Sequence, residues 1–388
     1  MQNLLFSLLL FSFLLSACTY RTTDKKSKTE IADASELNEF EFSSKIHYAQ
    51  GFTITRKEHY KIVSVYDPWQ KGQIYARYIL VPKGMPEPEK IDAGDQIIMI
   101  PFEKAGSLSA SHLAMISALQ AEKKLKGISN PNFVYDPSFR ERIKSGEIVS
   151  LGKEMDMDIE AIIGLNPDIL IKTGFPNAKN EDGALNEAGI PVVYNNEWME
   201  TSLLGRAEWI KFLAAFFNRE ARADSVFRKV ETNYFKMVNI GSKAKQYPSV
   251  LIGMPFKGTW YMSGGRSYMA QLLEDAGSDY YWQNDTTRGS IPLSFEVVLE
   301  KQQDCDFWFE VNARTRQEVI AKDTRYGLFK AFQNKNLFNN KKRMNKHGGN
   351  DYWQSGVLRP DLILADLIHI IHPEFLPNHQ LYYYQKVK

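Results

Sequence analysis

The sequence predicts an α/β protein with two similar lobes, each built on a parallel sheet, joined by a long helical segment. Short apolar runs alternate with helical patterns on both sides of the chain's middle, as is typical of parallel α/β sheets. Residues 201–239 contain no proline, and their apolar residues recur every three or four positions. Met157–Ile163 and Leu293–Leu299 share one pattern, in which an apolar residue, a glutamate and an apolar run follow a capping residue. These two copies flank the helical segment, which favours two lobes.

The chain opens with a segment that we interpret as a signal peptide, residues 1–17. Leu4–Leu15 is apolar but shorter than the ~20 residues that a membrane-spanning helix needs. Ser16 and Ala17 precede Cys18, and together with Leu15 they resemble the lipobox of bacterial lipoproteins, in which the cysteine is lipidated. The start departs from that pattern because residues 1–3 lack Lys and Arg. An uncleaved signal with an incidental cysteine is the alternative.

Residues 18–55 are predicted to form the lipidated N-terminus and a tether. Thr19–Asn38 is polar and has no aromatic residue beyond Tyr20, so it cannot bury enough apolar surface to fold by itself. A lipid, a flexible tether and a large soluble body are therefore expected to follow one another.

The first lobe is predicted over residues 56–200. It begins with a hairpin, because two β-rich runs flank the turn residues DPWQKG. Asp136 before Pro137 predicts a capped helix start, and Asp158 predicts another. The expected elements are the strands His59–Tyr66, Gln73–Val81, Gln96–Ile100, Ile169–Ile171 and 190–194, and helices at 112–119, 138–145 and 158–166.

The linking segment is predicted over residues 201–239 and the second lobe over residues 240–388. A helix of some ~35 residues would reach ~50 Å and would act as a rigid spacer, with a break expected near Asn218. The second lobe is expected to begin with a strand at Ser249–Met254 and to end in the apolar helix Asp361–Ile371.

Charge and cysteine content narrow the class of protein. The chain has 48 Lys and Arg against 46 Asp and Glu, a net charge of +2, without long runs of one sign. A nucleic-acid-binding surface is therefore not expected. Cys305 is the only other cysteine and lies in the apolar run CDFWF, where it fits a small buried hydrophobe. A disulfide framework is excluded.

The chain carries none of the common catalytic motifs. It has no G-x-S-x-G elbow, no phosphate-binding G-x-x-x-x-G-K-[ST] loop, no H-E-x-x-H and no G-x-G-x-x-G after a strand. The sequence therefore offers little for catalysis: we predict no catalytic residues and no cofactor, and keep a lipid-anchored envelope hydrolase as an alternative.

The histidines do not form an obvious metal site. His369 and His372 share a helical face among isoleucines, which favours packing over metal binding. His112 follows a Gly/Ser loop, where it would either touch a ligand or cap the next helix, and His347 lies in a flexible loop near Asp351. No set of three or four ligands is evident at strand ends, so binding of bare zinc or manganese is the weaker reading.

Several pieces of the chain, taken in order, resemble one family. They are IEAIIGLNPDILI, LNEAGIPVVYNNEW, GRAEWIKFLAAFFN, YMSGGRSYMAQLLEDAGSDYYW, LSFEVVLEKQQDCDFWF and RPDLILADLIHIIHPEFLP, and the resemblance covers about Gln96–Pro377. The family is the substrate-binding proteins of bacterial ABC importers, in the class whose two lobes are joined by one rigid helix. Its members carry ferric siderophores, haem or vitamin B12. The resemblance implies Rossmann-like lobes with a ligand cleft between them, at the carboxyl ends of the strands.

Loops at these strand ends supply the candidate ligand-binding residues. Aromatic faces suit a large, partly planar ligand, and arginines suit its anionic groups. The alternative for each ring is that it seals the interior of a lobe. The candidates are His112, Asn130, Phe175, Trp198, Trp260, Tyr261, Arg266, Trp282, Arg288, Tyr352 and Trp353.

Glu160 and Glu296 are candidates for docking to a permease. If Asp158 and Ser294 cap their helices, each glutamate occupies the second helical position and points outward. The resemblance implies that one acidic residue on each lobe docks onto arginines of the two permease subunits. The alternative is that each carboxylate merely favours its helix dipole.

Together these observations predict a monomeric binding protein of the cell envelope, attached to the membrane only through the lipid on Cys18. Its expected partners are a small-molecule metal chelate and an ABC importer permease dimer. A ferric siderophore or haem is the first choice of ligand, and a corrinoid such as cobalamin is the second.

Overall fold

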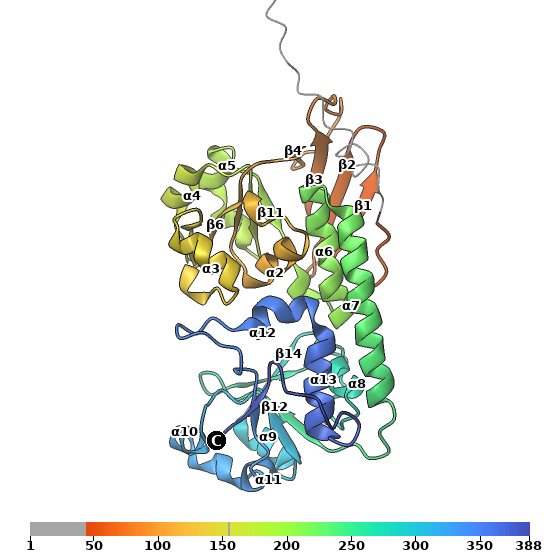
Figure 1. Cartoon of the computed structure of the whole chain (residues 1–388), viewed down its shortest axis with the longest axis vertical. Helices are drawn as coiled ribbons and strands as arrows, with labels where there is room; N and C mark the ends of the chain where they lie inside the picture. The colour runs from red at the N-terminus through yellow and green to blue at the C-terminus, as the bar shows by residue number, and fades with distance from the viewer. Residues whose placement is uncertain (1–43, 154–155) are drawn as a thin grey trace, which may run out of the picture.

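The computed structural model describes residues 44–153 and 156–388. Cys18, the signal peptide at 1–17 and most of the tether lie outside the described residues. The body consists of two α/β lobes stacked along its long axis, with helix α7 (Glu220–Gly241) running along one side of both (Figure 1). The predicted fold class, two α/β lobes with parallel strands and a helical connection, is confirmed.

A four-stranded sheet precedes the main sheet of the first lobe. Strands β1 (Phe52–Arg56), β2 (Lys61–Tyr66) and β3 (Ile74–Pro82) are antiparallel, and β4 (Gln96–Ile100) adds to β3 in parallel. The predicted hairpin is therefore confirmed as β2–β3. The Phe52 ring packs 4.8 Å from Trp209 and 5.5 Å from Phe212, which attaches this sheet to helix α6 (Leu203–Phe217).

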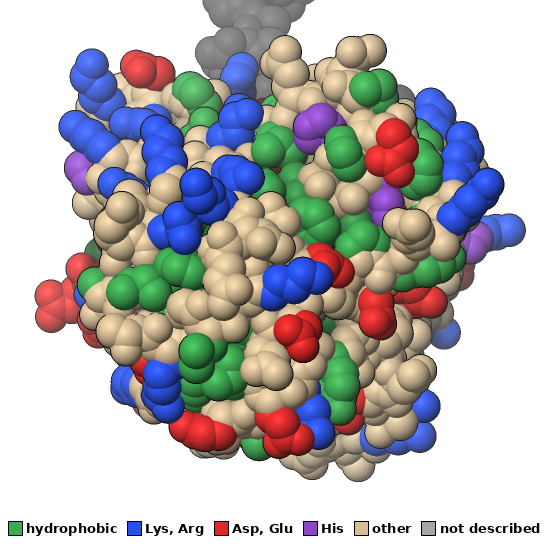
Figure 2. Space-filling view, turned by 90° about the horizontal axis from the view of Figure 1, so that it is seen from below, with side chains coloured by type: hydrophobic (Ala, Val, Ile, Leu, Met, Phe, Trp, Pro, Cys, Tyr) green, Lys and Arg blue, Asp and Glu red, His purple; other side chains and the backbone are tan. Residues whose placement is uncertain are grey.

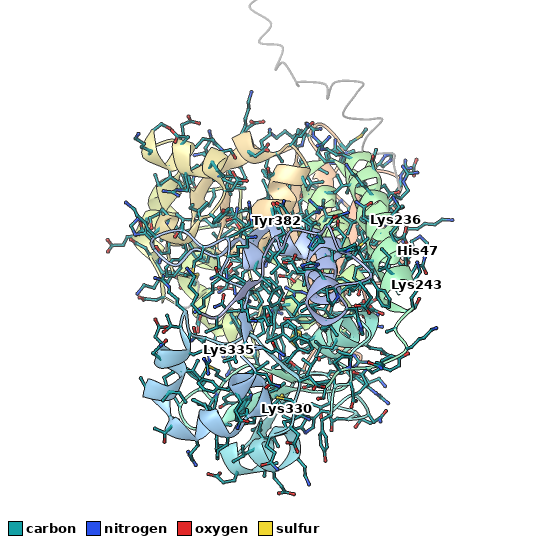
Figure 3. The ribbon with its side chains drawn as sticks, turned by 60° about the horizontal axis from the view of Figure 1, so that its bottom comes forward. His47, Lys236, Lys243, Lys330, Lys335 and Tyr382 are labelled. Atoms are coloured by element: carbon teal, nitrogen blue, oxygen red, sulfur yellow. The ribbon has the colours of Figure 1, made fainter. Side chains whose placement is uncertain are left out.

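Two buried carboxylates hold the segment that leads into this sheet. Glu208 accepts hydrogen bonds from the backbone N–H groups of residues 47–49 at 2.7–3.0 Å, and Glu200 accepts from residues 50 and 51 at 2.8–3.1 Å. His47 accordingly lies beside the helices on the α7 side of the body, where Lys236 also lies (Figure 3). The ordered body thus begins before residue 56, earlier than the predicted end of the tether, because these acceptors lie far away in sequence.

The main sheet of the first lobe is parallel throughout. Its strand order is β11 (Val192–Tyr194), β10 (Ile169–Lys172), β5 (Ala105–Ser107), β6 (Leu125–Ile128) and β7 (Val149–Ser150). A short hairpin, β8 (Gly152–Lys153) and β9 (Asp156–Met157), follows it. The helices of this lobe are α2 (Ala110–Ala118), α3 (Pro137–Lys144), α4 (Ile159–Leu165) and α5 (Gly183–Glu187), besides α6.

The predicted helix starts are confirmed by their caps. The Asp136 carboxylate accepts from the Ser138 N–H at 2.7 Å, and the Asp158 carboxylate accepts from the Ala161 N–H at 2.9 Å. Each cap satisfies one of the N–H groups that a helix start leaves without an intrahelical partner. A short polar side chain before an apolar run is therefore sufficient to define these boundaries.

The linking segment is two helices rather than one. Asn218 adopts a left-handed conformation, with φ of 53°, and ends α6. Helix α6 packs within the first lobe and against α7, so α7 alone spans the two lobes. With 22 residues, α7 extends about 33 Å, which is shorter than the spacer expected over 201–239.

The second lobe is built around the parallel pair β12 (Val250–Ile252) and β15 (Phe307–Phe309), which single bridges extend to Asp279 and Leu337. Strands β13 (Trp260–Ser263) and β14 (Ser290–Leu293) form an antiparallel pair, as do β16 (Phe338–Asn339) and β17 (Gln385–Lys386). The helices are α8 (Tyr268–Asp275), α9 (Phe295–Gln302), α10 (Arg316–Lys322), α11 (Lys330–Gln333), α12 (Asp351–Gln354) and α13 (Pro360–Ile371).

The lobes meet at a second place besides α7. Helix α12 belongs to the second lobe but packs against α2 of the first lobe. The Asn345 side-chain amide donates to the carbonyl oxygens of Asn132 at 2.9 Å and Val134 at 3.0 Å. The Tyr135 N–H donates to Gln354 Oε1 at 2.8 Å. We call these three hydrogen bonds the interlobe clasp.

The surface at the second-lobe end carries both signs of charge. Lys and Arg side chains gather along the upper left of this face, and Asp and Glu lie along its lower part (Figure 2). Among the described helices, none is both long and apolar enough to cross a membrane.

Candidate functional site

A cleft of about 930 Å³ lies between the two lobes. On the first-lobe side it is lined by residues that directly follow parallel strands: Leu108 and Ser109 after β5, Ser129 and Asn130 after β6, and Thr173 after β10. Ligands of open α/β sheets bind at this edge, outside the carboxyl ends of the strands. The cleft therefore occupies the position that the sequence predicts for the ligand.

Aromatic rings form much of the cleft wall. Phe133, Trp198 and Trp353 line it while remaining 54%, 37% and 48% exposed. The Phe175 ring lies 5.8 Å from the Trp198 ring, at an angle of 41°. Large aromatic side chains that are left open to solvent and grouped in one cleft mark a surface that binds an apolar or aromatic partner.

The cleft also carries positive charge. Lys153, Arg206 and Arg288 line it, against the two carboxylates of Glu197 and Glu200. Arg206 Nε lies 2.8 Å from Glu197 Oε2. Burial alone would lower the pKa of Arg206, but Glu197 more than offsets this, so the pKa is raised and the guanidinium stays charged.

Glu200 lines the cleft, but its carboxylate is engaged by donors of the protein. Its carboxylate accepts from the Trp209 indole N–H at 2.8 Å as well as from the backbone of residues 50 and 51. Burial raises the pKa of Glu200, and these donors counteract part of that rise. Both acidic groups of the cleft are thus bound by protein donors, which leaves Lys153 and Arg288 to meet an anion.

Two helices begin at the cleft, one from each lobe. Ser109–Ser111 at the start of α2 and Ser267–Met269 at the start of α8 both line it. The positive ends of the helix dipoles and the first N–H groups therefore face the ligand space. This arrangement adds to the attraction of the basic side chains for anionic groups.

The structure brings together five of the eleven predicted ligand-binding residues. Those that line the cleft are Asn130, Phe175, Trp198, Arg288 and Trp353. The other six do not line the cleft, and the local structure explains the positions of most of them.

Trp260 belongs to the core of the second lobe. Its side chain is 0% exposed, its ring stacks 5.8 Å from Trp308, and its indole N–H donates to the Ile252 carbonyl at 2.9 Å. The sequence suggested a loop, but the residue begins strand β13, in which successive side chains point to opposite faces. Tyr261 consequently lies on the opposite face of the strand from Trp260, where it is exposed but does not line the cleft.

Tyr352 and Trp282 also pack against neighbouring rings instead of the cleft. Tyr352 is buried, with its ring 5.8 Å from both Tyr383 and Tyr384 of the C-terminal segment. Trp282 is half-buried against Tyr280, at 5.8 Å. Arg266 is exposed but lies outside the cleft lining.

His112 lies beneath the cleft wall, not at its surface. It is fully buried, and Nδ1 lies 3.1 Å from the Ser107 hydroxyl. Burial lowers the pKa of His112 to about 4, so the ring is neutral. His369 and His372 bond to backbone carbonyl oxygens at 2.9 Å, as the packing interpretation predicts. Within residues 44–153 and 156–388, no group of three or more His, Cys, Asp or Glu is placed to hold a metal ion.

Sequence reasoning missed several residues of the cleft. Arg206 is the clearest of these, because its guanidinium lies 4.4 Å from the centre of the Tyr268 ring and so joins the two lobes at the cleft. A signal was present in the sequence: an arginine in the first turn of a largely apolar helix, just after a loop predicted to bind ligand. The missed residues with charged or large side chains are Leu108, Phe133, Lys153, Glu197, Met199, Glu200, Arg206, Tyr268 and Met269.

Comparison with known proteins decides the family. A sequence model described as "Periplasmic binding protein" matches residues 107–344, more than half of the chain. The chain belongs to the periplasmic binding protein family. This periplasmic binding protein has a relative in Methanocaldococcus jannaschii, described as an uncharacterized lipoprotein, which is 26% identical over 325 residues and is matched over 80% of this chain and 76% of its own.

Solved structures share the fold of this periplasmic binding protein. One is a possible iron-binding, periplasmic solute-binding protein from Staphylococcus epidermidis (TM-score 0.55, 19% identity, 70% of this chain and 99% of that one). Others are S. aureus IsdE complexed with heme (0.52, 19%, 70% and 99%) and a periplasmic heme-binding protein from Pseudomonas aeruginosa (0.55, 19%, 74% and 98%). As a member of this family, the protein is a binding protein and not an enzyme.

Proposed function

We propose that this protein captures an anionic metal chelate with aromatic character, a ferric siderophore or haem, and delivers it to an ABC permease. The observation that carries the proposal is the combination of open aromatic rings with basic side chains in one interlobe cleft of about 930 Å³. That volume is near the upper end of ~300–1,000 Å³ for ligand pockets, so a large small molecule fits it.

Each part of the lining suits a part of such a ligand. Trp198 and Trp353 offer ring faces to catecholate or tetrapyrrole surfaces. Arg288 and Lys153 offer charge-assisted hydrogen bonds to phenolate or carboxylate oxygens. The metal of a chelate is already coordinated by the chelator. This mode of binding therefore needs no cluster of metal-coordinating side chains in the protein. The names of the similar heme- and iron-binding proteins agree with this choice.

Replacing Trp353 by Ala should weaken chelate binding about tenfold, because one open ring contributes on the order of 1–2 kcal/mol of contact. Titration calorimetry with haemin, a ferric tricatecholate and cobalamin measures the affinities. Tyr247→Ala is the matched control, since Tyr247 is a comparably exposed aromatic residue that lies outside the cleft. Preference for cobalamin would move the proposal to a corrinoid ligand, and equal losses in the two variants would contradict the cleft as the binding site.

We also propose that the body is held at the membrane by a lipid on Cys18, as the lipobox-like start and the lipoprotein relative suggest. Cys18→Ser should move the protein from the membrane fraction to the soluble fraction, because a thioether-linked lipid can form only on the thiol. Fractionation of cells labelled with radioactive palmitate measures this. Persistence of label and of membrane association in the variant would disprove the anchor.

Glu160 and Glu296 are proposed as the contacts with the permease. Both are exposed and occupy the second position of equivalent helices, α4 in the first lobe and α9 in the second. Glu296 also pairs with the exposed Arg325 at 2.9 Å. Exposed pairs of this kind are worth little, about 0–1 kcal/mol, so a permease arginine can compete for the carboxylate.

A further inference from the structure

The β2–β3 turn, residues 67–72, reaches the ligand cleft from outside the part of the chain that the family model matches. That match begins at residue 107. Nevertheless Pro68, in the turn, lines the same cleft as Phe175 and Trp198. The four-stranded sheet that precedes the first lobe therefore supplies part of the cleft wall.

The turn has a fixed shape. The Asp67 carboxylate accepts hydrogen bonds from the N–H groups of Trp69 at 2.7 Å and Gln70 at 2.8 Å. The Asp67 N–H donates to the Gln73 carbonyl at 2.9 Å, and Gly72 takes the positive φ of 84° that closes the turn. A turn held at both ends in this way can position a side chain accurately.

Trp69 connects this turn to the aromatic wall. Its ring lies 6.3 Å from the Trp198 ring and 5.5 Å from the Tyr75 ring. The Tyr75 hydroxyl in turn donates to the Phe175 carbonyl at 2.8 Å. The Trp198 ring therefore packs against the rings of both Phe175 and Trp69. Its side chain nevertheless remains 37% exposed to solvent.

We propose that the β2–β3 turn is a specificity element of the cleft, in which Trp69 positions Trp198 for stacking on the aromatic part of the chelate and Pro68 contacts the same part. This inference rests on the proposed function. It names the class of ligand more closely: chelates with an aromatic surface, such as a tetrapyrrole or a tricatecholate, are favoured over aliphatic hydroxamates. Trp69 is a positioning residue, because its ring is not part of the cleft lining.

The test compares Trp69→Ala, Trp69→Phe and the control Tyr66→Ala in the full soluble body. Tyr66 is an exposed aromatic residue of the same hairpin that does not line the cleft. The probes are haemin and a ferric tricatecholate on one side and ferric desferrioxamine B on the other. Trp69→Ala should lose about five- to tenfold in affinity for the aromatic chelates and less than about twofold for the hydroxamate. Trp69→Phe should restore most of the loss, and Tyr66→Ala should change neither affinity.

A readout without ligand tests the positioning itself. In protein labelled with 5-fluorotryptophan, the Trp198 fluorine signal, assigned through Trp198→Phe, should shift in Trp69→Ala and stay in place in Tyr66→Ala. An unmoved signal overturns the positioning role, even if the affinities fall. Equal losses for aromatic and hydroxamate probes overturn the specificity role while the proposed function stands. Failure of the unaltered protein to bind any of the three chelates overturns both proposals.

Discussion

Reversing the charge of both Glu160 and Glu296 to Arg should abolish uptake in cells while leaving ligand affinity within about twofold. Both carboxylates are exposed, and neither lines the cleft, so the binding site is not touched. The connecting helix α7 fixes the spacing of the lobes and hence of the two charges. With arginine at both positions, each lobe would present a positive charge to a permease arginine. The like charges would repel at both contacts and prevent docking. Uptake of labelled chelate and titration of the purified protein measure the two quantities.

A matched pair of reversals controls for the change in net charge. Glu187 in α5 and Glu300 in α9 are exposed glutamates near the ends of helices of the same two lobes. Glu187→Arg with Glu300→Arg makes an identical change in charge and should leave uptake nearly normal. Loss of uptake in both double variants would mean that overall charge, and not docking at Glu160 and Glu296, limits transport.

Replacing Glu208 by Ala should lower the free energy of unfolding by about 3–5 kcal/mol. Its carboxylate is 0% exposed, accepts from three consecutive N–H groups of residues 47–49, and pairs with the buried Lys211 at 2.9 Å. Removal leaves the backbone donors of residues 47–49 without their acceptor and takes the nearest carboxylate from the Lys211 ammonium, which keeps only the Lys45 carbonyl and the more distant Asp224 at 3.5 Å. Urea denaturation followed by circular dichroism measures the loss.

Glu231→Ala provides the comparison for this effect. Glu231 contacts the same segment through a single hydrogen bond, from the Tyr48 hydroxyl at 2.6 Å, and is only half-buried. We expect a loss of about 1 kcal/mol or less. If Glu208→Ala costs no more than Glu231→Ala, the buried carboxylate does not hold the entry segment to the body.

The features that were predicted correctly depend on neighbours in sequence. Asp136 and Asp158 each bond to an N–H two or three residues ahead, so a short window of sequence contains both partners. The break at Asn218 was expected for a similar reason, since asparagine tolerates the left-handed conformation that ends α6. What this local view could not show is that α6 folds back onto the first lobe, because that depends on apolar contacts with a sheet far away in sequence.

The candidate site was predicted only in part because a cleft wall is a long-range property. Trp198 and Trp353 were identified from loops that do reach the cleft. Trp260 was misplaced because pairing of its strand with β14, some thirty residues later, decides which face its ring occupies. Arg206 and Pro68 were missed because a helix and a hairpin turn acquire a role in the cleft only when their lobe folds. Sequence patterns thus locate the ends of strands better than the orientation of single side chains.

The interlobe clasp has a consequence for the kinetics of capture. The lobes are joined by α7, by the packing of α12 on α2, by the Arg206–Tyr268 contact and by the interlobe clasp, so a wide opening breaks at least the three hydrogen bonds of the clasp. At about 0.5–1.5 kcal/mol each, the loss of these bonds alone costs on the order of 2–4 kcal/mol, which limits widely open molecules to roughly one in a hundred or fewer. Association through that minor population is slowed by the same fraction, and dissociation is slowed with it. We therefore expect a bound ligand to have a long residence time in the closed cleft, and the proposed permease partner to speed release by favouring the open conformation.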